Sequence, residues 1–332
     1  MPSSSSFMCY PIIIPTLNRF SHFKACIESL AACFHASETE LIIGLDFPPA
    51  EKYIDGWKKI KEYIPSIKGF KNVECFERTE NYGSFKNSSE LQNYVLTKYD
   101  AYIYTEDDNI FSPAFLDFIN KGLERYRDDP DVVSICGYSY PIKWETTASA
   151  ILQHQYFSAW GYGEWGKKRT LLLNDLSSEF IRKALTDKES LRQLNFSPKN
   201  KIMTLFLFNT EEISCIDIVR SLYLTITKKY VLMPTVSLVK NNGWDGSGEH
   251  CCDIRLSIFK DQKICDPQKL NKNSAQIVVF SENLEKFQMK IFENRNRNKV
   301  KAFVILLMIK ILGFDLAKKL YKSFKELKHG IK

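Results

Sequence analysis

Apolar residues along the first third of the chain recur with two different periods. Continuous β-branched runs at Tyr10–Pro15 and Leu41–Leu45 are typical of buried strands in a parallel sheet. Between these runs, apolar residues recur at three- and four-residue steps, which predicts an amphipathic helix over residues 21–36 with Ser21 as its N-cap. The opening segment is therefore predicted to be a strand–helix–strand unit.

The same alternation continues toward the middle of the chain. Strands are predicted over residues 73–76, 101–104, 132–136 and 231–239, and helices over 54–64, 90–98 and 115–126. Residues 171–222 have mainly helical spacing. This order predicts a doubly wound α/β fold whose mostly parallel sheet binds ligands beyond the carboxyl ends of its strands.

Composition and charge narrow the class of protein. With 332 residues, of which 44% are hydrophobic and 26% charged, the chain is in the range of globular proteins with a large core. Much of the net charge of +7 lies in the C-terminal segment rather than in a basic domain, which argues against nucleic acid as a partner. Nine cysteines without a CxxC pair, and a serine-rich start without a secretory leader, favour reduced thiols in the cytoplasm.

Three adjacent carboxylates follow the predicted strand at 101–104, namely Glu106, Asp107 and Asp108. Gathered carboxylates repel one another, and a hard divalent cation such as Mn²⁺ or Mg²⁺ is a physical reason to place them together. The alternative is an acidic helix N-terminus, because Ser112 and Pro113 begin the next predicted helix. The residues alone favour neither interpretation.

Two residues at other strand ends are candidates for nucleotide contacts. Asp46 ends the second predicted strand and is placed to accept a hydrogen bond from a base or ribose. Arg19 follows the first strand and is placed to pair with a phosphate or stack on a base. The alternative interpretations are a loop aspartate and a surface arginine.

A third candidate is a carboxylate within an aromatic segment. Residues 157–165 read FSAWGYGEW, and Glu164 is surrounded by aromatic residues there. Apolar surroundings raise a carboxylate pKa toward the range of a general base, and aromatic faces suit sugar rings. The alternative is a packed aromatic turn with Glu164 exposed.

Residues 241–252 read NNGWDGSGEHCC and predict a glycine-rich loop that closes over a diphosphate. Ser247 is a candidate phosphate contact in this loop. His250 is a candidate metal ligand, although a lone histidine is more often structural.

In this order, the segments resemble the inverting GT-A glycosyltransferases, in particular family 2-type bacterial enzymes and the Golgi N-acetylglucosaminyltransferases of N-glycan branching. The resemblance covers residues 10–255 and is carried by PIIIPTLNRF, LIIGLD, YTEDDNIFSPAFLDF, FSAWGYGEW and PTVSLVKNNGWDGSGEH. It implies a GT-A (Rossmann-like) fold and a nucleotide-diphosphate sugar as donor, with a UDP-sugar favoured by Asp46. The implied acceptor is a glycan or lipid-linked glycan, and the implied process is the synthesis of a bacterial surface polysaccharide.

The resemblance also assigns roles to residues. It implies a metal site at Glu106, Asp107, Asp108 and His250, and a general base at Glu164 with Asp217 as a second candidate. The implied donor contacts are Pro15, Thr16, Arg19, Asp46, Asn81, Gly83, Asp107 and Ser247. Glu164 departs from the family pattern, which often has an aspartate at the base position.

The predicted domain is 8–255, with a nucleotide-binding half at 8–110, an acceptor-side half at 111–255 and a C-terminal extension at 256–332. The extension combines an apolar run, too short to span a bilayer, with many lysines. It predicts either a helix on the inner face of the cytoplasmic membrane or a packed helix with a solvated lysine face. Two rival functions remain: a non-catalytic nucleotide-sugar or glycan-binding module, and a nucleotidyltransferase.

Overall fold

The computed structural model describes most of the chain in two compact units. The described residues are 8–141, 144, 146, 148–153, 157–188, 190, 206, 216–247, 262–266, 275–277 and 296–329. The first unit takes its residues from 1–153, 158–169 and 231–278, and the second from 154–157, 170–230 and 279–332.

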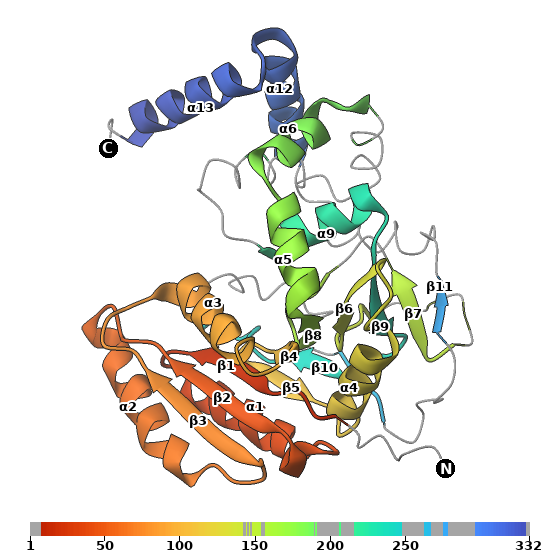
Figure 1. The fold of residues 1–332 in the computed structure, drawn as a ribbon. Coiled ribbons are helices and arrows are strands. Elements are labelled where there is room, and N and C mark those ends of the chain that lie inside the picture. The colour runs from red at the N-terminus through yellow and green to blue at the C-terminus, as the bar shows by residue number, and fades with distance from the viewer. Residues whose placement is uncertain are drawn as a thin grey trace. The chain divides into compact units, whose positions relative to one another are not determined.

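A mostly parallel sheet forms the first unit (Figure 1). Its strands are β1 (Ile12–Thr16), β2 (Glu40–Leu45), β3 (Asn72–Glu77), β4 (Ala101–Tyr104), β6 (Val132–Cys136), β7 (Ala150–Gln153), β8 (Tyr162–Trp165), β9 (Tyr230–Pro234) and β11 (Ala275–Ile277). Within the described residues their order is β11-β7-β9-β6-β8-β4-β1-β2-β3. Strands β3, β2, β1 and β4 are parallel, and β8 is antiparallel to both β4 and β6. The carboxyl ends of β1, β2 and β4 therefore meet at one edge.

Helices cover both faces of this sheet (Figure 1). They are α1 (Phe20–Ala31), α2 (Ile54–Tyr63), α3 (Gly83–Val95) and α4 (Phe115–Arg125), with 3₁₀ turns η1 (Ala36–Glu38), η2 (Glu51–Tyr53) and η3 (Ile64–Ser66). Two glycines allow close helix–sheet contact. A Cβ on Gly44 would meet Leu91 of α3 at 2.9 Å, and one on Gly163 would meet Ile119 of α4 at 2.6 Å.

A small antiparallel ribbon joins distant parts of the first unit. Its strands are β5 (Asn109–Phe111) and β10 (Val239–Asn241), and Asn241 pairs with Asn109. Because β5 directly follows the acidic cluster, this pairing brings residues 241–243 to that cluster.

The second unit is helical in its described part. Its helices are α5 (Gly166–Asp175, from Thr170 on), α6 (Ser178–Thr186), α9 (Ile216–Thr227), α12 (Asn296–Leu312) and α13 (Phe314–His329). Helices α6, α9, α12 and α13 share a core with Phe206, made of Ile181, Ala184, Leu185, Phe206, Leu222, Ile305, Ile309, Phe314 and Ala317. Leu172 of α5 packs in a second cluster with Val219 and Tyr223 of α9. Among the described helices, none combines the length and the apolar character needed to cross a bilayer.

The predicted α/β architecture is confirmed, with differences at element boundaries. The helix predicted over 21–36 ends at Ala31, because the chain reverses at His35 (φ 68°) into η1. The helix predicted over 90–98 begins earlier, at Gly83 (φ 69°), whose left-handed backbone suits glycine. The strand predicted over 231–239 is two separate strands, β9 and β10.

The predicted division at 8–110, 111–255 and 256–332 stays a prediction, while the compact units group the chain as follows. Residues 170–230 belong to the second unit, together with the C-terminal helices. The reason is their apolar face: Leu222 of α9 and Ile181 of α6 share one core with Ile305 and Ile309 of α12. The C-terminal helices α12 and α13 thus share a core with α6 and α9.

Six cysteines of the described residues form no disulfide with one another. Free thiols are found at Cys9, Cys26, Cys33, Cys75, Cys136 and Cys265. Cys215, Cys251 and Cys252 lie outside the described residues.

Candidate functional site

The candidate site lies where β1, β2 and β4 end. The amide of Asp46, after β2, donates to the carbonyl of Thr16 at 2.9 Å, and the amide of Thr105, after β4, donates to the carbonyl of Ile13 at 3.2 Å. These bonds continue the parallel ladder by one residue. They bring the loop that holds the acidic cluster beside the loops that follow β1 and β2.

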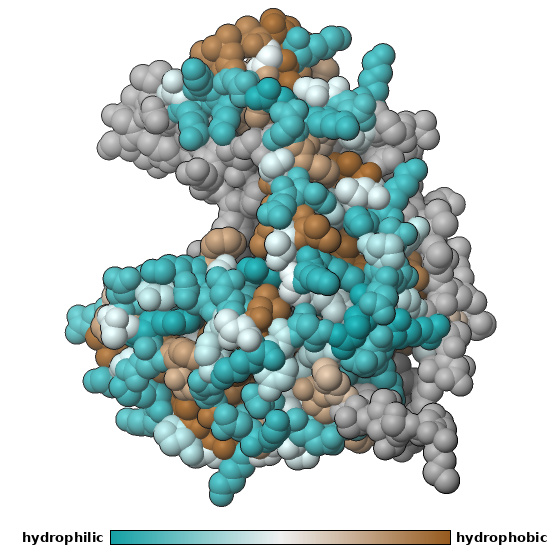
Figure 2. All heavy atoms as spheres, in the orientation of Figure 1, coloured by the Kyte–Doolittle hydropathy of each residue, from teal (hydrophilic) through white to brown (hydrophobic). Residues whose placement is uncertain are grey.

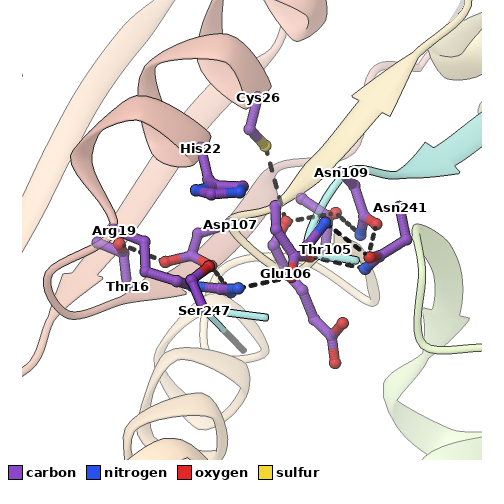
Figure 3. A network of polar contacts seen from close by, with 12 residues as sticks. Thr16, Arg19, His22, Cys26, Thr105, Glu106, Asp107, Asn109, Asn241 and Ser247 are labelled. Atoms are coloured by element: carbon purple, nitrogen blue, oxygen red, sulfur yellow. Dashed lines mark hydrogen bonds and ion pairs between the residues drawn. The ribbon is translucent and has the colours of Figure 1, made fainter. Parts of the chain in front are cut away.

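Arg19 joins the two aspartates of the acidic cluster (Figure 3). Its Nη2 lies 2.5 Å from Oδ1 of Asp107, and its Nη1 lies 2.9 Å from Oδ2 of Asp108. The hydroxyl of Thr16 donates to the other oxygen of Asp107 at 2.8 Å. The predicted residues Thr16, Arg19, Asp107 and Asp108 are therefore in direct contact.

The β10 end holds Asp108 from the other side. The side-chain amide of Asn241 donates to Oδ1 of Asp108 at 2.8 Å, and the amide of Asn242 donates to the Asp108 carbonyl at 2.8 Å. The amide of Gly243 donates in turn to Oδ1 of Asn241 at 2.9 Å. Asp108 is thus fixed by residues from both ends of the first unit's chain.

Burial makes the charge balance of this cluster important. Asp107 and Asp108 are buried, and one guanidinium faces two carboxylates, which leaves an excess negative charge. Burial raises the pKa of Asp108, and the neighbouring Arg19 acts in the opposite direction. Oxygen ligands with uncompensated negative charge fit a hard divalent cation.

Glu106 differs from its two neighbours. Its side chain points away from the carboxylate of Asp107 (Figure 3). Its backbone carbonyl accepts a hydrogen bond from the thiol of Cys26 in α1 at 3.7 Å. In this conformation, the oxygen ligands of a cation site are those of Asp107 and Asp108.

Asp46 organises the loop before α3. Its Oδ1 accepts hydrogen bonds from the amides of Phe47 and Tyr82, at 2.9 and 2.8 Å. Its Oδ2 accepts one from the side chain of Asn81 at 3.3 Å. The predicted donor contacts Asp46, Asn81 and Gly83 are therefore brought together at the carboxyl end of β2.

The glycine-rich loop is described up to Ser247. The amide and hydroxyl of Ser247 donate to Oδ1 of Asp245 at 2.9 and 2.6 Å. Asp245 also lies 3.1 Å from Nε2 of His22 in the first turn of α1. The hydrogen bond from the Ser247 side chain lowers the pKa of Asp245. His250, the predicted fourth metal ligand, lies outside the described residues.

Glu164 lies in the interior of the sheet rather than in an exposed turn, and its role as the general base stays a prediction. It is a β8 residue paired with Tyr102 of β4 and Ser134 of β6, and its side chain is 1% exposed. The hydroxyl of Tyr102 donates to its carboxylate at 2.7 Å. This hydrogen bond fixes the direction of the Glu164 carboxylate between β4 and β6.

We expect Tyr102→Phe to lower the free energy of unfolding by about 1–3 kcal/mol, because it removes a donor from a buried carboxylate. Urea unfolding measures this. The control is Tyr63→Phe, since the Tyr63 ring contacts Phe20 and Phe23 edge-on and keeps these contacts without its hydroxyl. Equal stability of Tyr102→Phe and wild type would show that this hydrogen bond does not hold Glu164.

Two further predicted residues have no contact with the acidic cluster among the interactions described. Pro15 is a half-buried residue of β1, next to Thr16. Asp217 lies in the first turn of α9, in the second unit, and its carbonyl accepts a hydrogen bond from Ser221 at 2.8 Å. Their roles stay predictions.

Gly243 provides a steric test of the cluster. A Cβ at this position would lie 2.3 Å from Oδ2 of Asp108 and 3.2 Å from Nη1 of Arg19. We expect Gly243→Ala to displace Asp108 and weaken Mn²⁺ binding at least tenfold, which corresponds to about 1.4 kcal/mol. Titration of Mn²⁺ measures the effect. Asn242→Ala changes an exposed side chain of the same turn and is the control.

Sequence reasoning missed three residues of this region. Asn241 and Gly243 fix Asp108, and Tyr102 holds Glu164. The Asn-x-Gly pattern at 241–243 was the available signal for the first two. No local pattern indicates the third, because strand β8 was not predicted.

Comparisons with known proteins give only distant likenesses. No family model matches the chain, and no curated protein matches it. Among solved structures, S. aureus TarS 1–349 has 10% identity and a TM-score of 0.46, covering 96% of this chain and 92% of that one. The mannosyltransferase PcManGT from Pyrobaculum calidifontis, in complex with GDP-Man and Mn²⁺, has 12% identity and a TM-score of 0.42, covering 96% and 80%.

A longer S. aureus TarS chain is matched over 51% of this chain and 30% of its own length, with 14% identity and a TM-score of 0.33. The present chain thus spans under a third of that protein. At these scores, the functional assignment depends on the site's own residues.

Proposed function

We propose that the chain is a metal-dependent, inverting GT-A glycosyltransferase that transfers a hexosyl or N-acetylhexosaminyl group from a nucleotide-diphosphate sugar. The observation that carries the proposal is the pair Asp107 and Asp108, buried at the carboxyl end of β4 and bridged by Arg19. Carboxylates with an adjacent arginine at this edge suit a cation together with a diphosphate.

Different residues of the site would bind the cation and the phosphates of the donor. Asp107 and Asp108 would hold Mn²⁺ or Mg²⁺, which would neutralise charge on the leaving diphosphate. Thr16 and Asn241 orient the two carboxylates through their hydrogen bonds. Arg19 is the one positive side chain in contact with both of them among the described residues, and it would pair with the phosphates.

The end of β2 would receive the nucleoside. Asp46 fixes the loop through its contacts with Phe47 and Tyr82, and it retains acceptor capacity for a base or ribose. The ring of Phe47 is exposed and lies edge-on to Trp57 at 6.1 Å, which leaves an aromatic face for stacking. These features support a uridine nucleotide, which the sequence also favours through Asp46.

The general base is the open part of the proposal. The two predicted acids are Glu164, which is buried in β8, and Asp217, which lies in the first turn of α9. An inverting reaction needs a carboxylate that takes the proton of the acceptor hydroxyl as this hydroxyl attacks the anomeric carbon. We propose that one of the predicted acids, Glu164 first and Asp217 second, has this role and that a glycan or lipid-linked glycan supplies the hydroxyl.

The donor class is tested by a panel of UDP-, GDP- and CDP-sugars. We expect Mn²⁺ together with a UDP-sugar to raise the melting temperature more than either alone, because ligands that bind the folded state stabilise it. Asp46→Asn, which keeps the shape of the side chain, should reduce the stabilisation. No stabilisation by any nucleotide sugar would refute the proposal.

The enclosed position of Glu164 also favours a second candidate, a nucleotide-sugar or glycan-binding module without catalysis. Hydrolysis of the donor in the presence of Mn²⁺ separates the two, since a binding module stabilised by the donor shows none. A nucleotidyltransferase has less support, because the loop after β1 reads PTLNRF rather than a glycine-rich, lysine-containing sequence.

We further propose that the C-terminal helices lie on an anionic membrane surface, where a lipid-linked acceptor would be found. Hydrophobic atoms gather over the turn between α12 and α13 (Figure 2). The exposed apolar residues of the two helices are Phe303, Val304, Leu307, Ile311, Leu312, Leu316, Leu320 and Phe324. Exposed lysines on the same helices add attraction to anionic lipid.

Flotation with vesicles that contain phosphatidylserine tests this surface. Ile311→Ser with Phe324→Ser should reduce binding while leaving the core intact, since these side chains are 68% and 74% exposed. Leu171→Ser, which changes an exposed leucine of α5, is the control. Equal flotation of all three proteins would remove the membrane from the proposal.

A further inference from the structure

A second group of chemically reactive side chains lies near the N-terminal end of the described chain. Cys9 precedes β1, and His35 and Glu38 belong to the turn around η1. One sulfur, nitrogen or oxygen atom from each of these residues lies within 4.8 Å of the other two. None of the three belongs to the candidate donor site.

The backbone holds His35 in an unusual conformation. Its φ of 68° is in the left-handed region, which residues other than glycine rarely adopt. The carbonyl of His35 accepts hydrogen bonds from the Thr39 hydroxyl at 2.8 Å and from the Glu38 amide at 3.1 Å. These bonds fix the direction in which the imidazole leaves the chain.

Both imidazole nitrogens of His35 face carboxylates. Nδ1 lies 3.1 Å from Oε1 of Glu38, and Nε2 lies 3.4 Å from Oδ1 of Asp117 in α4. Asp117 is also paired with Lys121 at 2.7 Å, which keeps it in place. A histidine that binds a metal through one nitrogen commonly donates its other N–H to a carboxylate, and Asp117 is placed to accept it.

We propose that Cys9, His35 and Glu38 bind a divalent transition-metal ion, with Zn²⁺ as the best chemical match. Thiolate, imidazole and carboxylate are its usual ligands, with bonds of roughly 2.0–2.3 Å in tetrahedral geometry. The three side chains supply three ligands, and water supplies the fourth. Since Glu38 is exposed and Cys9 and His35 are partly exposed, the ion can enter from solvent.

Binding of the metal ion displaces the proton of the Cys9 thiol. Burial and the charge of Glu38 raise the pKa of Cys9, while Thr39 and Lys71 act in the opposite direction. The thiol is therefore protonated near neutral pH before the ion binds. The metal–sulfur bond forms as the S–H bond breaks, and one proton per ion goes to solvent.

The ion would join two separate segments of the first unit. Cys9 lies on the chain that leads into β1, whereas His35 and Glu38 lie between α1 and β2. A ligand that binds only the folded state stabilises it by mass action, so the ion would secure the start of the first strand.

Titration of the full chain with Co²⁺ tests the site, because a thiolate ligand gives a sulfur-to-cobalt charge-transfer band and the oxygen ligands of Asp107 and Asp108 do not. We expect the band in wild type and its loss in Cys9→Ser. Cys75→Ser changes another exposed cysteine and should retain the charge-transfer band. Zn²⁺ should abolish the band by competition.

Two further variants keep the test decisive if Cys9→Ser does not fold. His35→Asn removes the imidazole and retains a residue that tolerates the left-handed backbone, and it should also abolish the band. Asp117→Asn should weaken Co²⁺ binding about 10–100-fold without abolishing it. Absence of the band in wild type, or its persistence in folded Cys9→Ser or His35→Asn, would overturn the proposal.

Discussion

Asp108→Asn is expected to reduce sugar transfer by about 10²–10³-fold, the range found when one preorganised electrostatic contact to a reacting group is lost. The substitution keeps the oxygen that accepts from Asn241 and removes the negative charge that faces Arg19. The measurements are turnover of the stabilising nucleotide sugar and affinity for Mn²⁺. Both should fall together, because the same carboxylate serves the cation and the leaving diphosphate.

Asp128→Asn is the matched control for this prediction, since Asp128 is exposed at the end of α4. It changes the net charge equally and should leave both measurements unchanged. Full turnover of Asp108→Asn at saturating Mn²⁺ would contradict the assignment of Asp108 as a ligand.

Arg19→Ala is expected to change the affinities for metal and donor in opposite directions. Arg19 pairs with both carboxylates and neutralises part of their charge. Its removal should therefore strengthen Mn²⁺ binding without nucleotide by about 10–100-fold, or roughly 1.5–3 kcal/mol, the range for hydrogen bonds to charged groups. Binding of the nucleotide sugar should weaken, because a phosphate partner is lost. Separate calorimetric titrations of Mn²⁺ and of UDP measure the two effects.

Lys24→Ala is the control on the same helix, where Lys24 faces Glu28 at 3.8 Å on the surface. It removes one positive charge without touching the aspartates and should alter neither titration. Weaker Mn²⁺ binding by Arg19→Ala would mean that Arg19 organises the carboxylates rather than competing with the cation.

Much of the parallel half of the sheet could be predicted from the sequence. The runs at Ile12–Thr16 and Glu40–Leu45 are buried on both faces, so continuous β-branched sequence identified them. The short strand β8 was not predicted, because Tyr162–Trp165 contains a glycine and a carboxylate. Its strand character comes from pairing with β4 and β6, which no local pattern records.

The site was predicted where its residues follow strands. Thr16, Asp46 and Asp107 each come after or at the end of a parallel strand, and topology alone brings such positions together. Glu164 was assigned as a base from its aromatic neighbours in sequence. A strand directs successive side chains to opposite faces, so sequence neighbours do not define its surroundings, and Tyr102 of another strand became its partner.

The ribbon of β5 and β10 has a consequence for synthesis on the ribosome. Asp108 and its partner Asn241 are separated by 133 positions, so at about 5–20 residues per second the nascent chain carries Asp108 for roughly 7–27 seconds before Asn241 is made. During this interval Arg19, already translated, is available to shield the aspartate. Truncated products that end before β10 would therefore contain the first strands, but Asp108 would have Arg19 without Asn241 as a partner.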